Sequence, residues 1–182
     1  FGVADHAAVV APGTRIELYR QLAELCENVG DLQGAVNTFY QLAQLAPNDY
    51  PTLRALIRLH EQLQNSDALL EVLQQASYQL PRQSPERVPL LHRQALLLRE
   101  VGNEEAAEAC LQQLLEIDPS HGETIGALYT MYSQRGDWGK AVRMLLAAEA
   151  HTASPMHKAR LLHDAATARL HHLDDTDGAA AL

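Results

Sequence analysis

Residues 19–47 read YRQLAELCENVGDLQGAVNTFYQLAQLAP. The apolar residues on both sides of Gly30 and Asp31 recur three, four and seven positions apart, which places them on one face of an α-helix. Glycine tolerates the left-handed conformation that ends a helix, and an Asp side chain can accept from the free amides that open the next one. Pro47 cannot continue the second helix. The stretch therefore predicts a helix, a tight turn and a second helix.

The turn recurs three more times, as Gln64–Asn65, Gly102–Asn103 and Gly136–Asp137. The steps between positions 30, 64, 102 and 136 are 34, 38 and 34 residues. A period in this range indicates stacked supersecondary units rather than one globular core. Apolar or small residues stay in phase with the turn in every unit: Tyr19, Leu53, Leu91 and Ile125; Ala23, Ile57, Ala95 and Tyr129; Ala35, Leu69, Ala107 and Ala141; Phe39, Leu73, Leu111 and Leu145.

This pattern resembles the tetratricopeptide repeat, a pair of helices spanning 34 residues. In that family a large residue, Leu, a small residue and an aromatic residue mark the first helix, and Ala, an aromatic residue, Ala and Pro mark the second. The corresponding residues of the first repeat are Tyr19, Leu22, Ala23, Cys26, Ala35, Phe39, Leu42 and Pro47. The resemblance covers four repeats and part of a fifth. It implies an all-α fold, a right-handed α-solenoid of stacked antiparallel helix pairs.

The expected organisation is an N-terminal extension or linker over residues 1–13, followed by the array over residues 14–182. The expected repeats are about 14–47, 48–81, 84–119 and 120–153, with a partial repeat over 154–182. Thr14 with Glu17 and Ser120 with Glu123 have capping-box spacing, and Ser154 precedes Pro155 at a helix start. The longer step predicts an extended loop within residues 81–89, with the next helix starting near Pro85 or Pro89.

First-helix positions line the concave wall in the family's geometry. Projected onto it, Arg20, Arg54, His92 and Gly126 form one column, and Glu24, Arg58, Leu96 and Thr130 form the next. The candidate peptide-binding residues are Arg20, Arg54, Arg58, His92, Arg93 and Arg99. Planar guanidinium groups suit an acidic peptide segment or a free C-terminal carboxylate. The alternative is that these arginines pair with Glu17, Glu24, Glu27 and Glu61 on adjacent helices and form an ordinary solvated wall.

Other classes of site find little support in the sequence. A net charge of −9 argues against a general nucleic-acid surface, which needs basic stripes. Nucleophile-elbow and dinucleotide-binding motifs are lacking, and Gly136, Gly139 and Lys140 are too closely spaced for a phosphate loop. The C-terminal histidines lack metal-ligand spacing, and Asp175, Asp177 and Gly178 match only part of a calcium loop. We therefore expect neither an enzyme in this segment, nor a metal, nor a cofactor.

The sequence thus predicts a non-catalytic protein–protein interaction scaffold that binds a peptide or partner protein in a concave groove. Two alternatives remain: a structural array that self-associates through exposed repeat ends, and a docking or regulatory region of a larger enzyme. The open final unit favours an excerpt of a longer protein or an end that pairs with another copy. The absence of a signal or membrane segment favours the cytoplasm, as do two separated cysteines, and Arg-rich, Lys-poor usage suggests a bacterial source.

Overall fold

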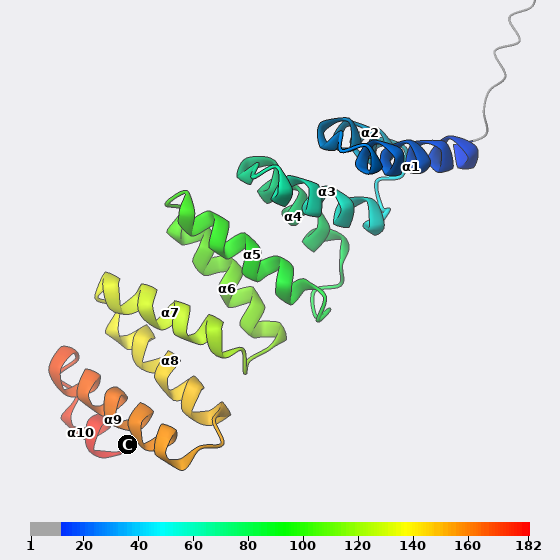
Figure 1. The fold of residues 1–182 in the computed structure, drawn as a ribbon. Coiled ribbons are helices and arrows are strands. Elements are labelled where there is room, and N and C mark those ends of the chain that lie inside the picture. The colour runs from blue at the N-terminus through cyan, green and yellow to red at the C-terminus, as the bar shows by residue number, and fades with distance from the viewer. Residues whose placement is uncertain (1–11) are drawn as a thin grey trace, which may run out of the picture. The chain divides into compact units, whose positions relative to one another are not determined.

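The computed structural model describes residues 12–182, and every regular element in that range is an α-helix. The expected extension over residues 1–13 lies almost wholly outside the described residues. The chain divides into two compact units, and the boundary between them falls between Leu80 and Pro81 in the sequence. The all-α fold built from helix pairs, expected from the repeated turn, is the observed one (Figure 1).

The N-terminal unit contains two antiparallel helix pairs. The first pair is α1 (Pro12–Asn28) with α2 (Leu32–Leu45), and the second is α3 (Tyr50–Gln62) with α4 (Ser66–Gln79). α2 also packs against α3, so the second helix of one pair contacts the first helix of the next. Leu42, Leu53 and Leu73 are among the fully buried side chains of this unit.

The C-terminal unit repeats the same arrangement. Its pairs are α5 (Arg87–Glu100) with α6 (Glu104–Ile117), α7 (Gly122–Arg135) with α8 (Trp138–His151), and α9 (Pro155–His172) with the short α10 (Thr176–Ala180). α6 packs against α7, and α8 packs against α9. The interface of α8 with α9 has its own apolar cluster, made by Val142, Leu145, Leu161, Ala165 and Ala168.

All four predicted turns have the expected backbone conformation. Gly30, Gly102 and Gly136 have φ values of 80°, 77° and 75°, and Gln64 adopts the same left-handed region at 53°. The next residue of each turn caps the following helix, since its side chain accepts a hydrogen bond from the backbone amide three residues on. The capping residues are Asp31, Asn65, Asn103 and Asp137.

A fifth turn follows 38 residues after Gly136. Asp174 has a φ of 51°, and the Asp175 side chain accepts from the amide of Gly178 at 2.8 Å. Of the carboxylates that resemble part of a calcium loop in the sequence, Asp175 therefore caps α10 and Asp177 lies in the first turn of that helix. The second 38-residue step is the signal in the sequence that could have identified this turn.

The apolar columns of the second helices are buried as expected. The residues five positions after each turn (Ala35, Leu69, Ala107 and Ala141) and nine positions after it (Phe39, Leu73, Leu111 and Leu145) are all buried. His60 also lies in the core and is hydrogen bonded there, because its Nε2 is 2.9 Å from the hydroxyl of Tyr40 on α2.

Two of the predicted helix starts are wrong. α1 begins at Pro12, so Thr14 lies within the helix. α7 is capped by His121, whose Nδ1 accepts from the Thr124 amide, while the Ser120 hydroxyl donates to Asp118. Ser154 caps α9 as expected. α5 begins at Arg87, so Pro89 is in its first turn, where the missing amide hydrogen costs no helical hydrogen bond.

Candidate functional site

The predicted binding residues are distributed over both units. Arg20 lies on α1, and Arg54 and Arg58 lie on α3 of the N-terminal unit. His92, Arg93 and Arg99 all lie on α5 of the C-terminal unit. Three of these residues therefore belong to the N-terminal unit and three to the C-terminal unit.

Two arginines of the N-terminal unit are engaged in ion pairs within it. Arg58 Nη2 reaches both carboxylate oxygens of Glu27, at 2.8 and 2.7 Å, and so joins α3 to α1. Arg20 lies 3.5 Å from Glu17 and 3.6 Å from Asp49, the residue that precedes α3. Asp49 also accepts a hydrogen bond from the Thr52 hydroxyl. These contacts are of the kind that the solvated-wall alternative requires.

Arg54 differs from both of these arginines. Its side chain is exposed, and it makes no ion pair or hydrogen bond with any residue that the structure describes. It lies one helical turn before Arg58, so both side chains extend from one face of α3. The guanidinium group of Arg54 is thus available to an external acceptor, while that of Arg58 is held in place by Glu27.

The three residues on α5 are less exposed. His92 Nε2 lies 3.7 Å from a carboxylate oxygen of Glu123, and the His92 ring is 5.6 Å from that of His121. Arg93 and Arg99 are half-buried, and the Nε atom of Arg99 is buried without a hydrogen-bond partner among residues 12–182. The neighbouring Leu96 is 37% exposed. The candidate residues on α5 are therefore more constrained than Arg54.

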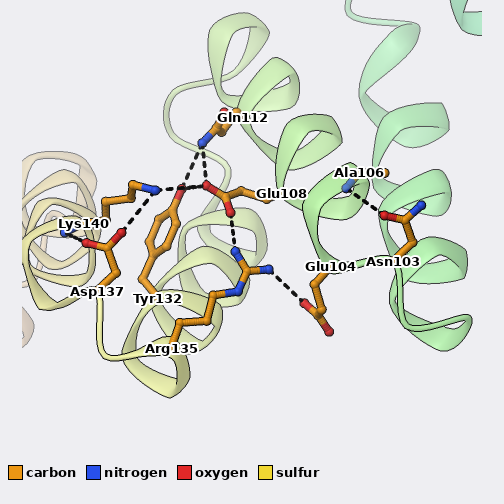
Figure 2. Close-up of polar contacts among 9 residues, drawn as sticks. All are labelled: Asn103, Glu104, Ala106, Glu108, Gln112, Tyr132, Arg135, Asp137 and Lys140. Carbon is orange, nitrogen blue, oxygen red and sulfur yellow. Dashed lines mark hydrogen bonds and ion pairs between the residues drawn. The ribbon is translucent and has the colours of Figure 1, made fainter.

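A polar cluster that our sequence analysis did not anticipate joins α6, α7 and α8 (Figure 2). Glu108 on α6 is its centre: one carboxylate oxygen accepts from Arg135 at 2.6 Å, and the other accepts from Tyr132 at 3.0 Å. Gln112 donates to both Glu108 and the Tyr132 hydroxyl, and Lys140 lies 3.5 Å from Glu108. Lys140 also pairs with Asp137 at 3.1 Å.

The electrostatics of this cluster favour the ionised carboxylate. Burial acts to raise the pKa of Glu108, but hydrogen bonds from Tyr132 and Arg135, with the charges of Lys140 and Arg135, outweigh it and lower the pKa. Burial raises the pKa of Tyr132, and the neighbouring carboxylate adds to the effect. Glu108 thus stays charged and Tyr132 stays neutral at ordinary pH. The arrangement holds three helices together and contains no activated nucleophile.

An open pocket of about 340 Å³ lies beside the cluster. α6 supplies Leu115 and Glu116 to its lining, α7 supplies Leu128 and Tyr132, and α8 supplies residues including Lys140 and Arg143. Charged side chains of both signs, Glu116, Lys140 and Arg143, border the pocket.

Metal and thiol chemistry receive little support from the geometry. Within residues 12–182, no group of three or more His, Cys, Asp or Glu side chains is placed to hold a metal ion. His172 stacks on Trp138 at a centroid distance of 3.6 Å, so it packs against the C-terminal apolar cluster. Burial raises the pKa of the Cys110 thiol, which disfavours the reactive thiolate.

None of the helices between residues 12 and 182 combines the length and the apolar character that crossing a bilayer requires.

Comparison with known proteins supports the resemblance to the tetratricopeptide repeat. Residues 88–121 match the family model of the tetratricopeptide repeat, and this range holds most of α5 and all of α6. No protein of curated function matches the chain in sequence.

Several solved tetratricopeptide-repeat proteins share the fold. The chain is 17% identical to MamA over 92% of its own length and 87% of that chain, with a TM-score of 0.58. MamA from Desulfovibrio magneticus RS-1 is 16% identical, with coverages of 93% and 92% and a TM-score of 0.53. YrrB, described as a TPR protein with an unusual peptide-binding site, is 15% identical, with coverages of 93% and 87% and a TM-score of 0.55. At these identities the likeness shows the fold alone.

Proposed function

We propose that this chain is a non-catalytic protein-interaction scaffold whose N-terminal unit binds an acidic peptide segment at Arg54 and Arg58. The observation that carries the proposal is the pair of guanidinium groups one turn apart on α3, one without a polar partner among the described residues and one fixed by Glu27. The fixed and the available guanidinium groups can together donate hydrogen bonds to two carboxylates of a peptide, or to one carboxylate and a main-chain carbonyl. The similarity to YrrB, a peptide-binding protein of the same fold, supports this class of function.

Exposed charge of this kind gives selectivity more than affinity. Arg58 is 52% exposed in its side chain, so water and salt screen its interactions, and Arg54 is also exposed. We therefore expect weak to moderate binding that decreases as salt increases. The arginines of α5 are not needed for this proposal, since they belong to the other unit.

The test uses a fluorescein-labelled peptide with four consecutive glutamates and a free carboxyl terminus, titrated against the full chain by fluorescence anisotropy. Arg54→Glu removes the available guanidinium without breaking an ion pair or hydrogen bond among residues 12–182, and we expect affinity to fall by about tenfold or more, the equivalent of one charge-assisted contact. Arg54→Glu with Arg58→Glu should abolish binding.

Arg160→Glu is the matched control, because Arg160 is exposed on α9 and also makes no ion pair among the described residues. The control changes the net charge equally and should retain binding. If the Arg54→Glu and Arg160→Glu variants bound the peptide with equal affinity, α3 would not be part of the binding site. Circular dichroism should show the same helicity for all of the variants.

A further inference from the structure

The open pocket of about 340 Å³ in the C-terminal unit has a largely apolar lining. Leu128 and Tyr132 of α7 lie deepest in it, since they are only 1% and 3% exposed. Leu115 of α6 and Met144 of α8 are half-buried and complete the apolar lining. A cavity of this size, lined by aliphatic, thioether and aromatic groups, suits a large apolar side chain.

Polar contacts hold the aromatic part of this lining in place (Figure 2). The Tyr132 hydroxyl accepts from Gln112 and donates to Glu108, both at 3.0 Å. The Lys140 ammonium lies 5.0 Å from the centre of the Tyr132 ring and is paired with both Glu108 and Asp137. The ring therefore has a fixed position before a ligand arrives, which lowers the entropic cost of binding.

Two charged side chains that border the pocket are not engaged in this way. Arg143 on α8 and Glu116 on α6 are exposed, and neither makes an ion pair or a hydrogen bond with any residue between 12 and 182. The pocket thus has an available guanidinium group on its α8 side and an available carboxylate on its α6 side. Lys140 is the other cation at the pocket, and two carboxylates already neutralise it.

The repeat itself does not require a cation at position 143. Lys140 and Arg143 lie four and seven positions after the turn residue Gly136. The residues at the same two positions after the turns at 30, 64, 102 and 174 are Gly34 and Asn37, Ala68 and Glu71, Ala106 and Ala109, and Gly178 and Ala181. Lys140 contributes to the Glu108 network, whereas Arg143 has no such structural role, so a ligand is the partner that its charge suits.

We propose that this pocket binds an extended peptide segment in which one acidic residue adjoins a large apolar residue such as Phe or Leu. Successive side chains of an extended segment point to opposite sides, so the apolar one enters the pocket while the acidic one lies at its rim. There the carboxylate accepts hydrogen bonds from the exposed Arg143 guanidinium group.

Glu116 makes the selectivity of this pocket different from that of the Arg54 site. Its carboxylate repels a second acidic side chain on the α6 side of the pocket, so a run of glutamates is a poor ligand here. The two units would therefore select different segments, a polyacidic one at Arg54 and Arg58 and an apolar–acidic one beside Arg143.

The experiment tests a direct contact between Arg143 and the acidic residue. The probe is a fluorescein-labelled peptide, Gly-Ser-Gly-Phe-Asp-Gly-Ser-Gly with an amidated carboxyl terminus, titrated against the full chain by fluorescence anisotropy. We expect Arg143→Glu to weaken binding by about tenfold or more. A second probe with Lys in place of Asp should show the reverse preference and bind the Arg143→Glu variant more tightly than the wild-type chain. A third probe, with Ala in place of Phe, should bind the wild-type chain about tenfold more weakly than the first.

Arg160→Glu on α9 is the control variant, because it changes the net charge equally at an exposed residue outside the pocket. It should leave the affinity of the first probe unchanged, and so should Arg54→Glu. Circular dichroism should show the same helicity for all variants. The proposal would be overturned if the first probe did not bind the wild-type chain, or if Arg143→Glu neither weakened its binding nor reversed the preference between the two charged probes.

Photocrosslinking locates the apolar contact. p-Benzoylphenylalanine replaces Phe in the first probe, irradiation links it to a neighbouring C–H bond of the full chain, and mass spectrometry identifies the linked residue. We expect links to Leu115, Leu128 or Met144. Links confined to other residues would overturn the proposal, as would binding only by a peptide that ends in Phe with a free carboxylate. None of these measurements depends on Arg54, so a failure here leaves the proposed peptide site of the N-terminal unit untouched, and a failure there leaves this pocket untouched.

Discussion

The α2/α3 interface of the N-terminal unit and the α6/α7 interface of the C-terminal unit place a polar contact at the same position of the repeat but form it from different side chains. Both place a polar side chain of the second helix against the first helix of the next pair, 20 residues along the chain. In the first interface the contact is a neutral Tyr40–His60 pair, and His60 Nδ1 is buried without a hydrogen-bond partner among residues 12–182. In the second, Tyr132 and Gln112 belong to a charged network centred on Glu108. The repeat therefore fixes where a polar contact lies, while the residue types decide how it responds to pH and salt.

The largest effect should come from the apolar column that the two interfaces share. Leu56→Ala on α3 and Leu128→Ala on α7 remove fully buried side chains, and each should lower the free energy of unfolding by about 2–5 kcal/mol. Leu22→Ala is the matched control in the same column of α1, where 47% exposure predicts a change within about 0.5 kcal/mol. Urea denaturation followed by circular dichroism, with hydrogen exchange to assign the unit affected, measures all three variants.

A large loss for Leu22→Ala would contradict the comparison, since it would mean that the Leu22 side chain is already covered as the Leu56 and Leu128 side chains are. Similar losses at Leu56 and Leu128 would show that apolar burial, and not the chemistry of the polar contact, holds successive pairs together.

A smaller effect should separate the two chemistries. Glu108→Gln removes the ion pair with Arg135 and places an amide opposite donors from Tyr132 and Gln112, so we expect a loss of about 1.5–3 kcal/mol from the C-terminal unit. Glu105→Gln on the same helix is the control, because Glu105 is exposed and makes no polar contact among the described residues. Tyr40→Phe, which breaks one neutral hydrogen bond, should cost about 1 kcal/mol.

The dependence on salt gives a second test of the loss expected for Glu108→Gln. The side chains of Arg135 and Lys140 are 37% and 41% exposed, so added salt should weaken the wild-type network and narrow the difference between wild type and Glu108→Gln. The cost of Tyr40→Phe should not change with salt. A salt-independent loss at Glu108 would indicate that its hydrogen bonds dominate over its charge.

The sequence allowed much of the fold to be predicted and less of the candidate site. The turns were predictable because residues such as Gly102 and Asn103 have a local conformational role that needs no tertiary context. The Glu108 cluster was not, because its members come from three helices and each is an ordinary surface residue type in isolation. The positions of Tyr40 and His60 relative to their turns, repeated by Gln112 and Tyr132, are the signal that could have revealed it.

The candidate arginines illustrate the same limit. Projection onto the family's first-helix columns placed Arg54 and Arg58 on one face, and they lie one turn apart on α3. The projection could not show which of the two arginines lacks an ion pair, because that depends on which acidic side chains lie near each guanidinium group. Glu27 reaches Arg58 from α1, and no described acidic side chain reaches Arg54.

The smallest effect concerns pH, and it distinguishes the two interfaces by the pH range in which each of them loses stability. Burial lowers the pKa of His60, so below about pH 6.5, the ordinary pKa of an unfolded histidine, the unfolded state binds more protons than the folded state. The stability of the N-terminal unit should therefore fall as pH decreases through this range. Glu108 has a lowered pKa, so its contribution should be retained there and lost only as pH falls below about 4.3.

His60 is the only histidine between residues 12 and 80, which makes the first effect assignable. Hydrogen exchange of α3 amides between pH 7 and pH 5 should show decreasing protection after correction for intrinsic rates, and His60→Leu should abolish the pH dependence while it also removes the unpartnered Nδ1. If the dependence survived His60→Leu, the neutral pair would not be the pH-sensitive element, and the contrast between the two interfaces would lie in salt response alone.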